Sequence, residues 1–296
     1  MKIFLTGATG FIGKHLVEKM KHENQITINL YGNETSPFSS DVSTYKIDEA
    51  NINKDIEYFK YECFDGIIHL ASLYLNVHEP VQATRLIDSN VRFSTHVIEC
   101  AVRANVSWFI NTGTYWQHYN NSNYNPVNLY AASKQAFECI SRYYVETNLI
   151  RFNTLKLSDT FGPNDTRPKI FNIWERIAHS GETLEMSGGE QLIDISYIDD
   201  VISAFYLLAE HLQNKNPQIQ NGQYFAVKAE KRYSLKELAL LFEEVTGLKL
   251  NIKWGARPYK EREVMHPWEN GISVPGWNPS KTISEGISQM EFNTQK

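Results

Sequence analysis

Strand-like apolar runs alternate with amphipathic stretches along the first half of the 296-residue chain. Short apolar runs suited to buried strands occupy residues 3–5, 26–31, 45–47, 66–70, 107–111 and 153–157. Helical periodicity occupies residues 15–22, 52–61, 81–104 and 129–148 between them. Regular alternation of strand and helix specifies a parallel sheet with helices on both faces. We therefore predict an α/β fold with a doubly wound parallel (Rossmann) sheet, whose ligands bind at the carboxyl ends of the strands.

The second half of the chain is less regular. Helical patterns cover residues 197–211 and 235–246, residues 181–189 are rich in turn formers, and Trp, Pro and Gly crowd residues 254–279. We predict a dinucleotide-binding domain over residues 1–160 and a smaller C-terminal region over residues 161–296 that binds mainly the nucleotide sugar inferred below. Part of this region, about residues 191–228, is expected to return to the first domain.

Composition and charge argue against several classes of binding partner. The chain is 42% hydrophobic and 21% charged, and its net charge of −5 comes without any block of like charges, which argues against nucleic acid or an anionic membrane as partner. No apolar run reaches the roughly 20 residues of a membrane-spanning helix. The three cysteines lack metal-ligand spacing, and the sequence shows no signal-peptide pattern. We expect a cytoplasmic protein without a metal site.

Three glycines follow the first apolar run. Gly7, Gly10 and Gly13 are spaced G-x-x-G-x-x-G directly after residues 3–5. Such a run predicts a strand, a tight turn and the start of a helix, where free N–H groups and the helix dipole favour a pyrophosphate. A plain glycine turn is the alternative, but the position at the end of a strand favours dinucleotide binding.

Tyr130 and Lys134 lie four residues apart in a predicted helix, so they share one face. A neighbouring ammonium favours the ionised form of a phenol, which would bring the pKa of Tyr130 toward neutral pH and allow proton transfer. Thr112 follows a predicted strand, and its hydroxyl could donate to a carbonyl oxygen. Alone, the Tyr–Lys spacing is also common on helix surfaces, and Thr112 could equally be a capping residue.

Several motifs occur together in a characteristic order. They are the run from Thr6 to Gly13 (TGATGFIG), Asp48, the run from His69 to Ser72 (HLAS), Asn90, Thr112, Tyr130 with Lys134, the run from Phe161 to Pro163 (FGP) and the run from Tyr197 to Asp200 (YIDD). In this order they resemble the extended short-chain dehydrogenase/reductase family, which contains nucleotide-sugar epimerases, dehydratases and ketoreductases.

The resemblance implies an enzyme with a catalytic trio of Tyr130, Lys134 and Thr112 and a bound nicotinamide dinucleotide. Lys134 would bind the nicotinamide ribose, Asp48 would lie near the adenine, and Thr112 would hold the substrate oxygen beside Tyr130. The residues implied to contact the cofactor are Gly7, Thr9, Gly10, Phe11, Ile12, Gly13, Asp48, Leu70, Ala71, Ser72, Asn90, Tyr130 and Lys134.

Departures from the family pattern narrow the reaction. Dehydratases of this family carry an Asp-Glu pair directly after the Thr, where this chain has Gly113 and Thr114, so elimination of water is not expected. The segments at residues 156–169 and 188–194 resemble the bacterial nucleotide-deoxysugar 4-ketoreductases of the family. We expect reduction of the 4-keto group of a CDP- or dTDP-linked 4-keto-6-deoxy hexose for surface polysaccharide (O-antigen). A nucleotide-sugar 4-epimerase, or less plausibly a non-catalytic dinucleotide-binding protein, remains open.

The substrate pyrophosphate requires cations. Ile193 stands where many relatives have an arginine, so other residues must serve. The candidate substrate-binding residues are Tyr74, Thr112, Thr114, Asp159, Arg167, Lys169, Arg257 and Arg262. Solvated surface charge is the alternative explanation for Lys169.

Cofactor choice and assembly complete the expectations. Residues 28–33 contain neither a carboxylate that would repel a 2′-phosphate nor an arginine that would bind one. We expect NADP(H) to be preferred, while Glu34, slightly further along, keeps NAD(H) possible. A homodimer is also expected, because relatives pair the helices that correspond to residues 81–104 and 129–148.

Overall fold

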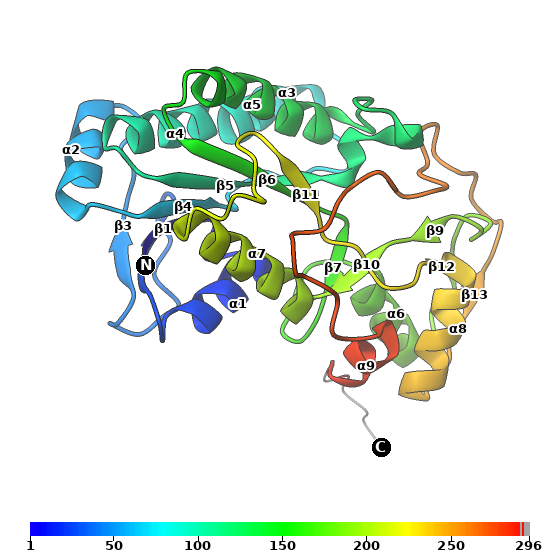
Figure 1. Cartoon of the computed structure of the whole chain (residues 1–296). Helices are drawn as coiled ribbons and strands as arrows, with labels where there is room; N and C mark the ends of the chain where they lie inside the picture. The colour runs from blue at the N-terminus through cyan, green and yellow to red at the C-terminus, as the bar shows by residue number, and fades with distance from the viewer. Residues whose placement is uncertain (291, 293–296) are drawn as a thin grey trace.

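The computed structural model describes residues 1–290 and 292, and it is built around a seven-stranded parallel sheet (Figure 1). The order of the strands is β11-β6-β5-β4-β1-β2-β3. Their bounds are β1 Lys2–Thr6, β2 Gln25–Asn29, β3 Ser43–Tyr45, β4 Gly66–His69, β5 Trp108–Thr114, β6 Arg151–Leu157 and β11 Tyr224–Ala226. The reversal of strand order beside β1 makes this a doubly wound sheet, which confirms the predicted fold class.

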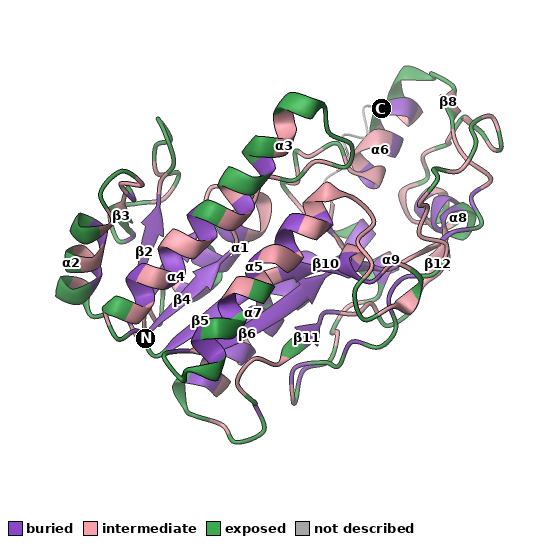
Figure 2. Cartoon of the chain, turned by 90° about the horizontal axis from the view of Figure 1, so that it is seen from above, coloured by how far each residue is buried: buried purple, intermediate pink, exposed green. Residues whose placement is uncertain are grey.

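Helices cover both faces of the sheet because the strand side chains alternate. Ile3 and Leu5 of β1 pack into the core beneath α1 (Phe11–Met20) and α7 (Ile198–Gln213), while Phe4 packs into a separate core on the other face. That other face carries α2 (Ile52–Glu62), α4 (Phe93–Arg103) and α5 (Leu129–Glu146). Figure 2 shows the buried strands beneath α4 and α5, whose outer faces are only partly buried or exposed.

The predicted helix at residues 81–104 is divided. It consists of α3 (Pro80–Ile87), a π-helical segment η1 (Asp88–Arg92) and α4. A π-helical turn inserts one extra residue into the helix and is frequent at functional sites. The turn contains Asn90, which is buried.

As far as its residues are described, the smaller region is built from three helices and three two-stranded sheets. The helices are α6 (Ile170–Ser180), α8 (Leu235–Thr246) and α9 (Ile283–Ser288). The strand pairs are β7 (Asp159–Phe161) with β10 (Ile195–Tyr197), β9 (Leu192–Ile193) with β12 (Tyr233–Ser234), and β8 (Leu184–Glu185) with β13 (Ile252–Lys253). Two elements from this half of the chain, α7 and β11, join the large sheet and its helical layer. Within the residues described, no helix is both long and apolar enough to cross a membrane.

Candidate active site

The glycine run forms a tight turn between β1 and α1. Gly7 has a φ of +73°, and a Cβ on it would lie 2.6 Å from the backbone nitrogen of Ala71. A Cβ on Gly13 would lie 2.2 Å from the carbonyl oxygen of Gly7. Helix α1 begins after Gly10, which supplies no side-chain cap, so the first N–H groups of the helix remain available to a ligand.

A cleft of about 490 Å³ opens beside this turn. We call it the glycine-loop cleft; its lining includes Gly7, Thr9, Gly10, Asn29, Tyr31, Glu34, Glu49, Leu70, Ala71, Ser72, Arg85 and Arg92. Phe11, Ile12 and Gly13 form the first turn of α1 beneath it. The space left by the missing side chains of Gly7 and Gly13 and the free N–H groups at the start of α1 fit the pyrophosphate of a dinucleotide.

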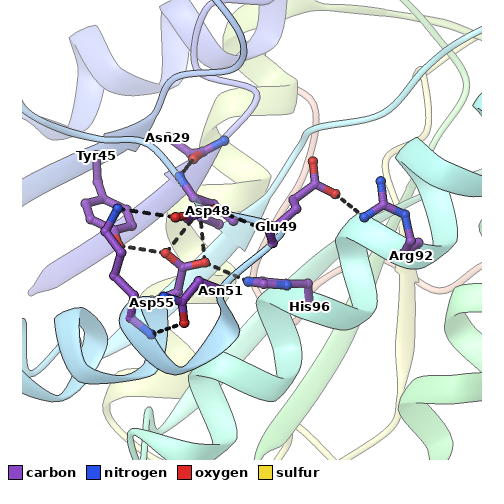
Figure 3. Close-up of polar contacts among 11 residues, drawn as sticks. Asn29, Tyr45, Asp48, Glu49, Asn51, Asp55, Arg92 and His96 are labelled. Atoms are coloured by element: carbon purple, nitrogen blue, oxygen red, sulfur yellow. Dashed lines mark hydrogen bonds and ion pairs between the residues drawn. The ribbon is translucent and has the colours of Figure 1, made fainter.

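Asp48 does not line this cleft. Figure 3 shows that its backbone N–H donates to both oxygens of the buried Asp55 carboxylate, at 3.1 and 3.0 Å. Its own carboxylate accepts from the N–H of Ala50 and pairs with Lys54. Its neighbour Glu49 lines the cleft instead and pairs with Arg92 at 2.8 Å.

The Asp55 carboxylate at the centre of Figure 3 also accepts hydrogen bonds from the Tyr45 hydroxyl at 2.6 Å and from His96 Nε2 at 2.7 Å. Asp55, His96 and Cys100 place potential metal-ligand atoms within 4.8 Å of one another. The hydrogen bonds already made by Asp55 account for this cluster, which ties α2 to α4 and supports the loop that carries Glu49.

Glu34 projects into the glycine-loop cleft. Its carboxylate accepts from the Thr9 hydroxyl at 3.1 Å and from the backbone N–H of Tyr31 at 3.0 Å. A negative charge therefore lies at the end of the second strand, although residues 28–33 carry none. This placement depends on the loop folding back toward Thr9, which the sequence did not reveal.

His69 and Asn90 hold the loop that follows β4. The Thr6 hydroxyl lies 2.8 Å from His69 Nδ1, and the Ser94 hydroxyl lies 2.8 Å from His69 Nε2. Since the Ser94 hydroxyl donates to the Asn90 carbonyl oxygen, it accepts from His69 Nε2–H. Burial, reinforced by nearby Lys134, lowers the pKa of His69 well below its usual value, so the ring is neutral.

The Asn90 side chain uses all of its hydrogen-bonding capacity. Its Oδ1 accepts from the N–H of Leu73 at 2.8 Å and from the Ser72 hydroxyl at 3.1 Å. Its Nδ2 donates to the Leu73 carbonyl at 3.0 Å and to the Ser133 hydroxyl at 2.9 Å. Asn90 does not line the cleft; it joins the 70–73 loop to the helix that carries Tyr130.

Tyr130 and Lys134 occupy the first two turns of α5, one turn apart, and Lys134 is 2% exposed. Burial raises the pKa of Tyr130 to about 12, and a hydrogen bond with Ser72 opposes this rise. Burial lowers the pKa of Lys134 to about 8, while Glu138 acts to raise it. The expectation that the pair brings the Tyr130 pKa toward neutral pH is wrong for the chain by itself, because desolvation of the phenol dominates. At neutral pH the site holds a protonated phenol beside a charged ammonium.

Thr112 lies in β5, at the carboxyl half of the sheet, and is partly buried. Its hydroxyl donates to the His69 carbonyl oxygen at 2.9 Å. The hydroxyl must rotate away from this bond before it can donate to a substrate. Thr114 has a structural role: its Oγ1 accepts from the N–H of Trp116 and caps the 3₁₀ turn η2 (Tyr115–Gln117).

Aromatic and charged side chains gather beside Tyr130. The rings of Tyr74 and Tyr130 meet edge to face with centroids 5.1 Å apart, and Trp116 lies 5.8 Å from Tyr74. Lys169 Nζ lies 4.9 Å from the centre of the Tyr74 ring and 2.7 Å from Asp159 Oδ1. The structure thus brings three predicted substrate-binding residues, Tyr74, Asp159 and Lys169, next to the predicted catalytic tyrosine.

Arg167 is held by its own neighbours. Its Nε and Nη2 donate to the Asp165 carboxylate, each at 2.7 Å, and Nη2 also donates to the Thr160 carbonyl at 2.9 Å. Its guanidinium lies 4.3 Å from the centre of the Phe11 ring. These contacts position Arg167 as a clamp between the smaller region and α1, and they occupy its Nε and Nη2 donors.

A second cavity, of about 120 Å³, lies between the sheet edge and the smaller region. We call it the C-terminal cavity; its lining includes Trp116, His118, Tyr119, Asp159, Ile193, Lys260, Arg262 and Trp268. Arg262 donates from Nη2 to Asn125 Oδ1 and stacks 4.4 Å above the Tyr119 ring. Its Nε is buried and has no partner among the described residues. Arg257 is exposed and does not line the cavity.

Contacts of Tyr130 connect it to both spaces. Ser72, its hydrogen-bond partner, lines the glycine-loop cleft, whereas Trp116, which packs on Tyr74, lines the C-terminal cavity. Tyr130 itself lines neither space, but through Ser72 and Tyr74 it is within one or two side-chain contacts of both.

The sequence of residues 3–221 matches the NAD dependent epimerase/dehydratase family, so the chain belongs to this family of enzymes. This confirms the predicted family. Relatives include CDP-abequose synthase of Yersinia pseudotuberculosis, 29% identical over 283 residues that cover 90% of this chain and 92% of that protein. CDP-abequose synthase of Salmonella muenchen is 28% identical, over 98% of this chain and 96% of that protein.

Solved structures of the same fold include the UDP-glucuronic acid 4-epimerase from Bacillus cereus in complex with UDP-glucuronic acid and NAD. It superposes with a TM-score of 0.80 over 98% of this chain and 97% of that one, at 18% identity. At this identity the likeness establishes the shared fold alone.

Proposed function

We propose that this protein is a cytoplasmic reductase that uses NAD(P)H to reduce the 4-keto group of a CDP- or dTDP-linked 4-keto-6-deoxy hexose in the synthesis of bacterial surface polysaccharide (O-antigen) sugars. The observation that carries the proposal is the protonated Tyr130, which contacts Ser72 of the glycine-loop cleft and Tyr74 on the side of the C-terminal cavity, with charged Lys134 one turn away. The two CDP-abequose synthases, which span nearly the whole chain, favour a nucleotide-linked deoxysugar as the substrate class.

The chain's own residues have distinct parts in this reaction. A nicotinamide dinucleotide bound in the glycine-loop cleft would supply the hydride. Tyr130 donates its phenolic proton to the C4 oxygen as charge develops there, and the Lys134 ammonium stabilises the phenolate that remains. Thr112 rotates from the His69 carbonyl to donate a hydrogen bond to the same oxygen. Tyr74 and Trp116 flank the sugar.

Packing around Gly113 argues against elimination of water. A Cβ at this position would lie 2.8 Å from Thr154 Cγ2 and 2.9 Å from both Glu138 Oε1 and Lys156 Cγ. The aspartate that dehydratases carry at this place has no room here. The neighbouring Thr114 hydroxyl is engaged in a cap and offers no acid.

A nucleotide-sugar 4-epimerase is the second candidate. Epimerases must first oxidise the sugar, for which the tyrosine has to act as a base. Burial raises the Tyr130 pKa to about 12, so the resting site holds a proton donor, which suits the reductive step; since an epimerase also needs that step, the substrate assay below decides between the two.

The position of Glu34 bears on the choice between NADP(H) and NAD(H). The sequence favoured NADP(H), but the Glu34 carboxylate in the glycine-loop cleft would repel a 2′-phosphate and accept from ribose hydroxyls. Arg92, which could bind that phosphate, is paired with Glu49 and Asp88. We therefore propose that NAD(H) is used at least as well as NADP(H).

For the substrate pyrophosphate, we propose Arg262 and Lys169 as the cationic ligands. Arg262 lines the C-terminal cavity with an unpartnered, buried Nε–H, and a guanidinium matches phosphate oxygens geometrically. Lys169 lies beside Tyr74 and can exchange Asp159 for a phosphate oxygen. Arg257 and Arg167 are not proposed, because Arg257 is exposed and does not line the cavity, and Arg167 is clamped by Asp165.

We also propose a homodimer formed by the outer faces of α3 and α5. Val81, Ile87 and Tyr143 expose apolar side chains on these helices, whereas Ile98, also within residues 81–104, is buried in the chain's own core. Sedimentation velocity tests this: replacement of Val81 and Ile87 by Glu should convert a dimer to a monomer, and an unchanged sedimentation coefficient would contradict it.

Incubation of the purified protein with a CDP- or dTDP-linked 4-keto-6-deoxy hexose and NADH or NADPH tests the function. Oxidation of one cofactor per sugar converted supports the reductase. Interconversion of two sugars without net consumption of cofactor would instead establish the epimerase.

A further inference from the structure

A buried ion pair lies directly behind the proposed catalytic lysine. Lys156 of β6 is 1% exposed, and its Nζ lies 3.2 Å from Glu138 Oε2. The other Glu138 oxygen, Oε1, is buried and has no hydrogen-bond partner among the residues described. Glu138 follows Lys134 by one turn on the same face of α5, and its negative charge acts on the Lys134 ammonium as well as on that of Lys156.

Packing keeps this carboxylate in place. Gly113 of β5 lies against it: a Cβ there would be 2.9 Å from Glu138 Oε1. The Lys156 stem fills the other side, and its ammonium lies 4.8 Å from the centre of the Tyr224 ring. Because the local dielectric is low, the electrostatic attraction between this carboxylate and each of the two ammonium groups is stronger than it would be in water.

Lys156 has a second, neutral partner. Its Nζ lies 2.8 Å from His118 Nε2, and His118 Nδ1 lies 3.0 Å from the Ser122 carbonyl oxygen. The ring therefore donates from Nδ1 and accepts from the ammonium at Nε2. Burial and nearby Lys156 lower the pKa of His118 to about 4, so at neutral pH the imidazole carries no charge that could compete for Glu138.

We propose that Glu138 is a positioning residue: it keeps the Lys134 ammonium charged for catalysis, and Lys156 limits this effect by sharing the same carboxylate. The other titratable groups near Lys134 carry no negative charge at neutral pH: Tyr130, one turn earlier on α5, is protonated, and His69 on β4 is neutral. The remaining titratable neighbours, His118 and Cys139, face Lys156. Glu138 is therefore the anion that opposes desolvation of Lys134.

The proposal predicts shifts of opposite sign for the two members of the pair. Glu138→Gln removes the anion, so Lys134 should lose its proton at a pH lower by about one unit. Lys156→Met removes the competing ammonium, so that Glu138 interacts with Lys134 alone. Lys134 should then lose its proton at a higher pH. Because Glu138→Gln leaves Lys156 buried and unpaired, it could unfold the chain. The double variant Glu138→Gln/Lys156→Met removes both charges and should lower the Lys134 pKa as Glu138→Gln does.

The experiment is an NMR titration of the Lys134 side chain in protein labelled with ¹³C-lysine, with the resonance assigned by its absence in Lys134→Arg. A lower transition in Glu138→Gln or in the double variant, together with a higher one in Lys156→Met, supports the proposal. Unchanged transitions in the variants that lack Glu138 would overturn it, and an unchanged or lower transition in Lys156→Met would overturn the sharing of charge.

The alkaline limb of the kcat profile should move in the same direction as each titration. The inference rests on the proposed role of Lys134, yet the titration needs no turnover. If the protein failed to reduce keto-sugars, the Lys134 titration could still be measured. Failure of the proposed function is therefore distinguishable from failure of the proposed role of Glu138.

Discussion

Replacement of Glu34 by Gln should move cofactor selectivity toward NADP(H). The carboxylate accepts from Thr9 and from the Tyr31 backbone, so it is held in the glycine-loop cleft rather than free in solvent. Two unit charges 4 Å apart repel by about 1 kcal/mol in water and by about 4 kcal/mol at an effective dielectric of 20. Glu34 is exposed, so the lower end of this range applies. A gain of about 1–2 kcal/mol for a 2′-phosphate corresponds to roughly 5- to 30-fold.

The assay is the ratio of kcat/KM with NADPH to kcat/KM with NADH, measured at one low ionic strength and again at high salt. The ratio should rise in Glu34→Gln and the rise should shrink with added salt. Glu57→Gln, on the exposed face of α2 and paired with Lys60, is the matched control and should leave the ratio unchanged. Equal ratios in the wild type and Glu34→Gln would refute the assignment of Glu34 to the adenosine ribose.

Three further predictions follow from the site. Reduction should decline as pH rises through about 8, because Lys134 loses its charge there while Tyr130 keeps its proton, and a flat kcat profile to pH 10 would contradict this. Tyr130→Phe should lower kcat by about 10²- to 10⁴-fold; fluorescence titration should show that the variant still binds NADH, and retained turnover would eliminate the proposed acid. Gly113→Ala should lower the free energy of unfolding by about 1–3 kcal/mol, because the added methyl group would overpack the space around Gly113. Urea denaturation measures this change, and an unaltered denaturation midpoint would contradict it.

The central sheet was predictable because its strands are buried on both faces and read as short apolar runs between helical patterns. Element ends were less predictable. Residues 45–47 were expected to form a strand, but β3 ends at Tyr45, because the N–H of Ile47 bonds to the Asn29 side chain instead of continuing the sheet. The π-helical turn at Asn90 could not be foreseen, since it depends on contacts with a distant loop.

Helix α6 was missed although its signal is present. Phe171, Trp174 and Ile177 are buried at helical spacing, and Gly181 ends the helix in the left-handed region with a φ of +71°. The helix starts just after a proline and lies in a region read as irregular, so its pattern was not recognised. A count of apolar positions at spacing i, i+3 and i+6 would have found it.

Within the site, the sequence motifs indicated the residues that surround the glycine loop and Tyr130. They could not indicate that Glu34 folds back to Thr9 or that Arg167 is clamped by Asp165, because both depend on side-chain contacts. The same holds for the pair of Glu138 and Lys156, which lies on separate elements and matters because it is buried. Burial also reversed the expected direction of the Tyr130 pKa, since desolvation is invisible in a linear motif.

The central claim is that hydride is added to C4 of a keto-sugar while Tyr130 supplies the proton. The direct measurement is NMR of the sugar formed from a CDP- or dTDP-linked 4-keto-6-deoxy hexose with nicotinamide cofactor deuterated on the transferring face. The account predicts one deuterium at C4 of the product and one cofactor oxidised per sugar. A product without deuterium, or sugars interconverted with no oxidised cofactor, would contradict it.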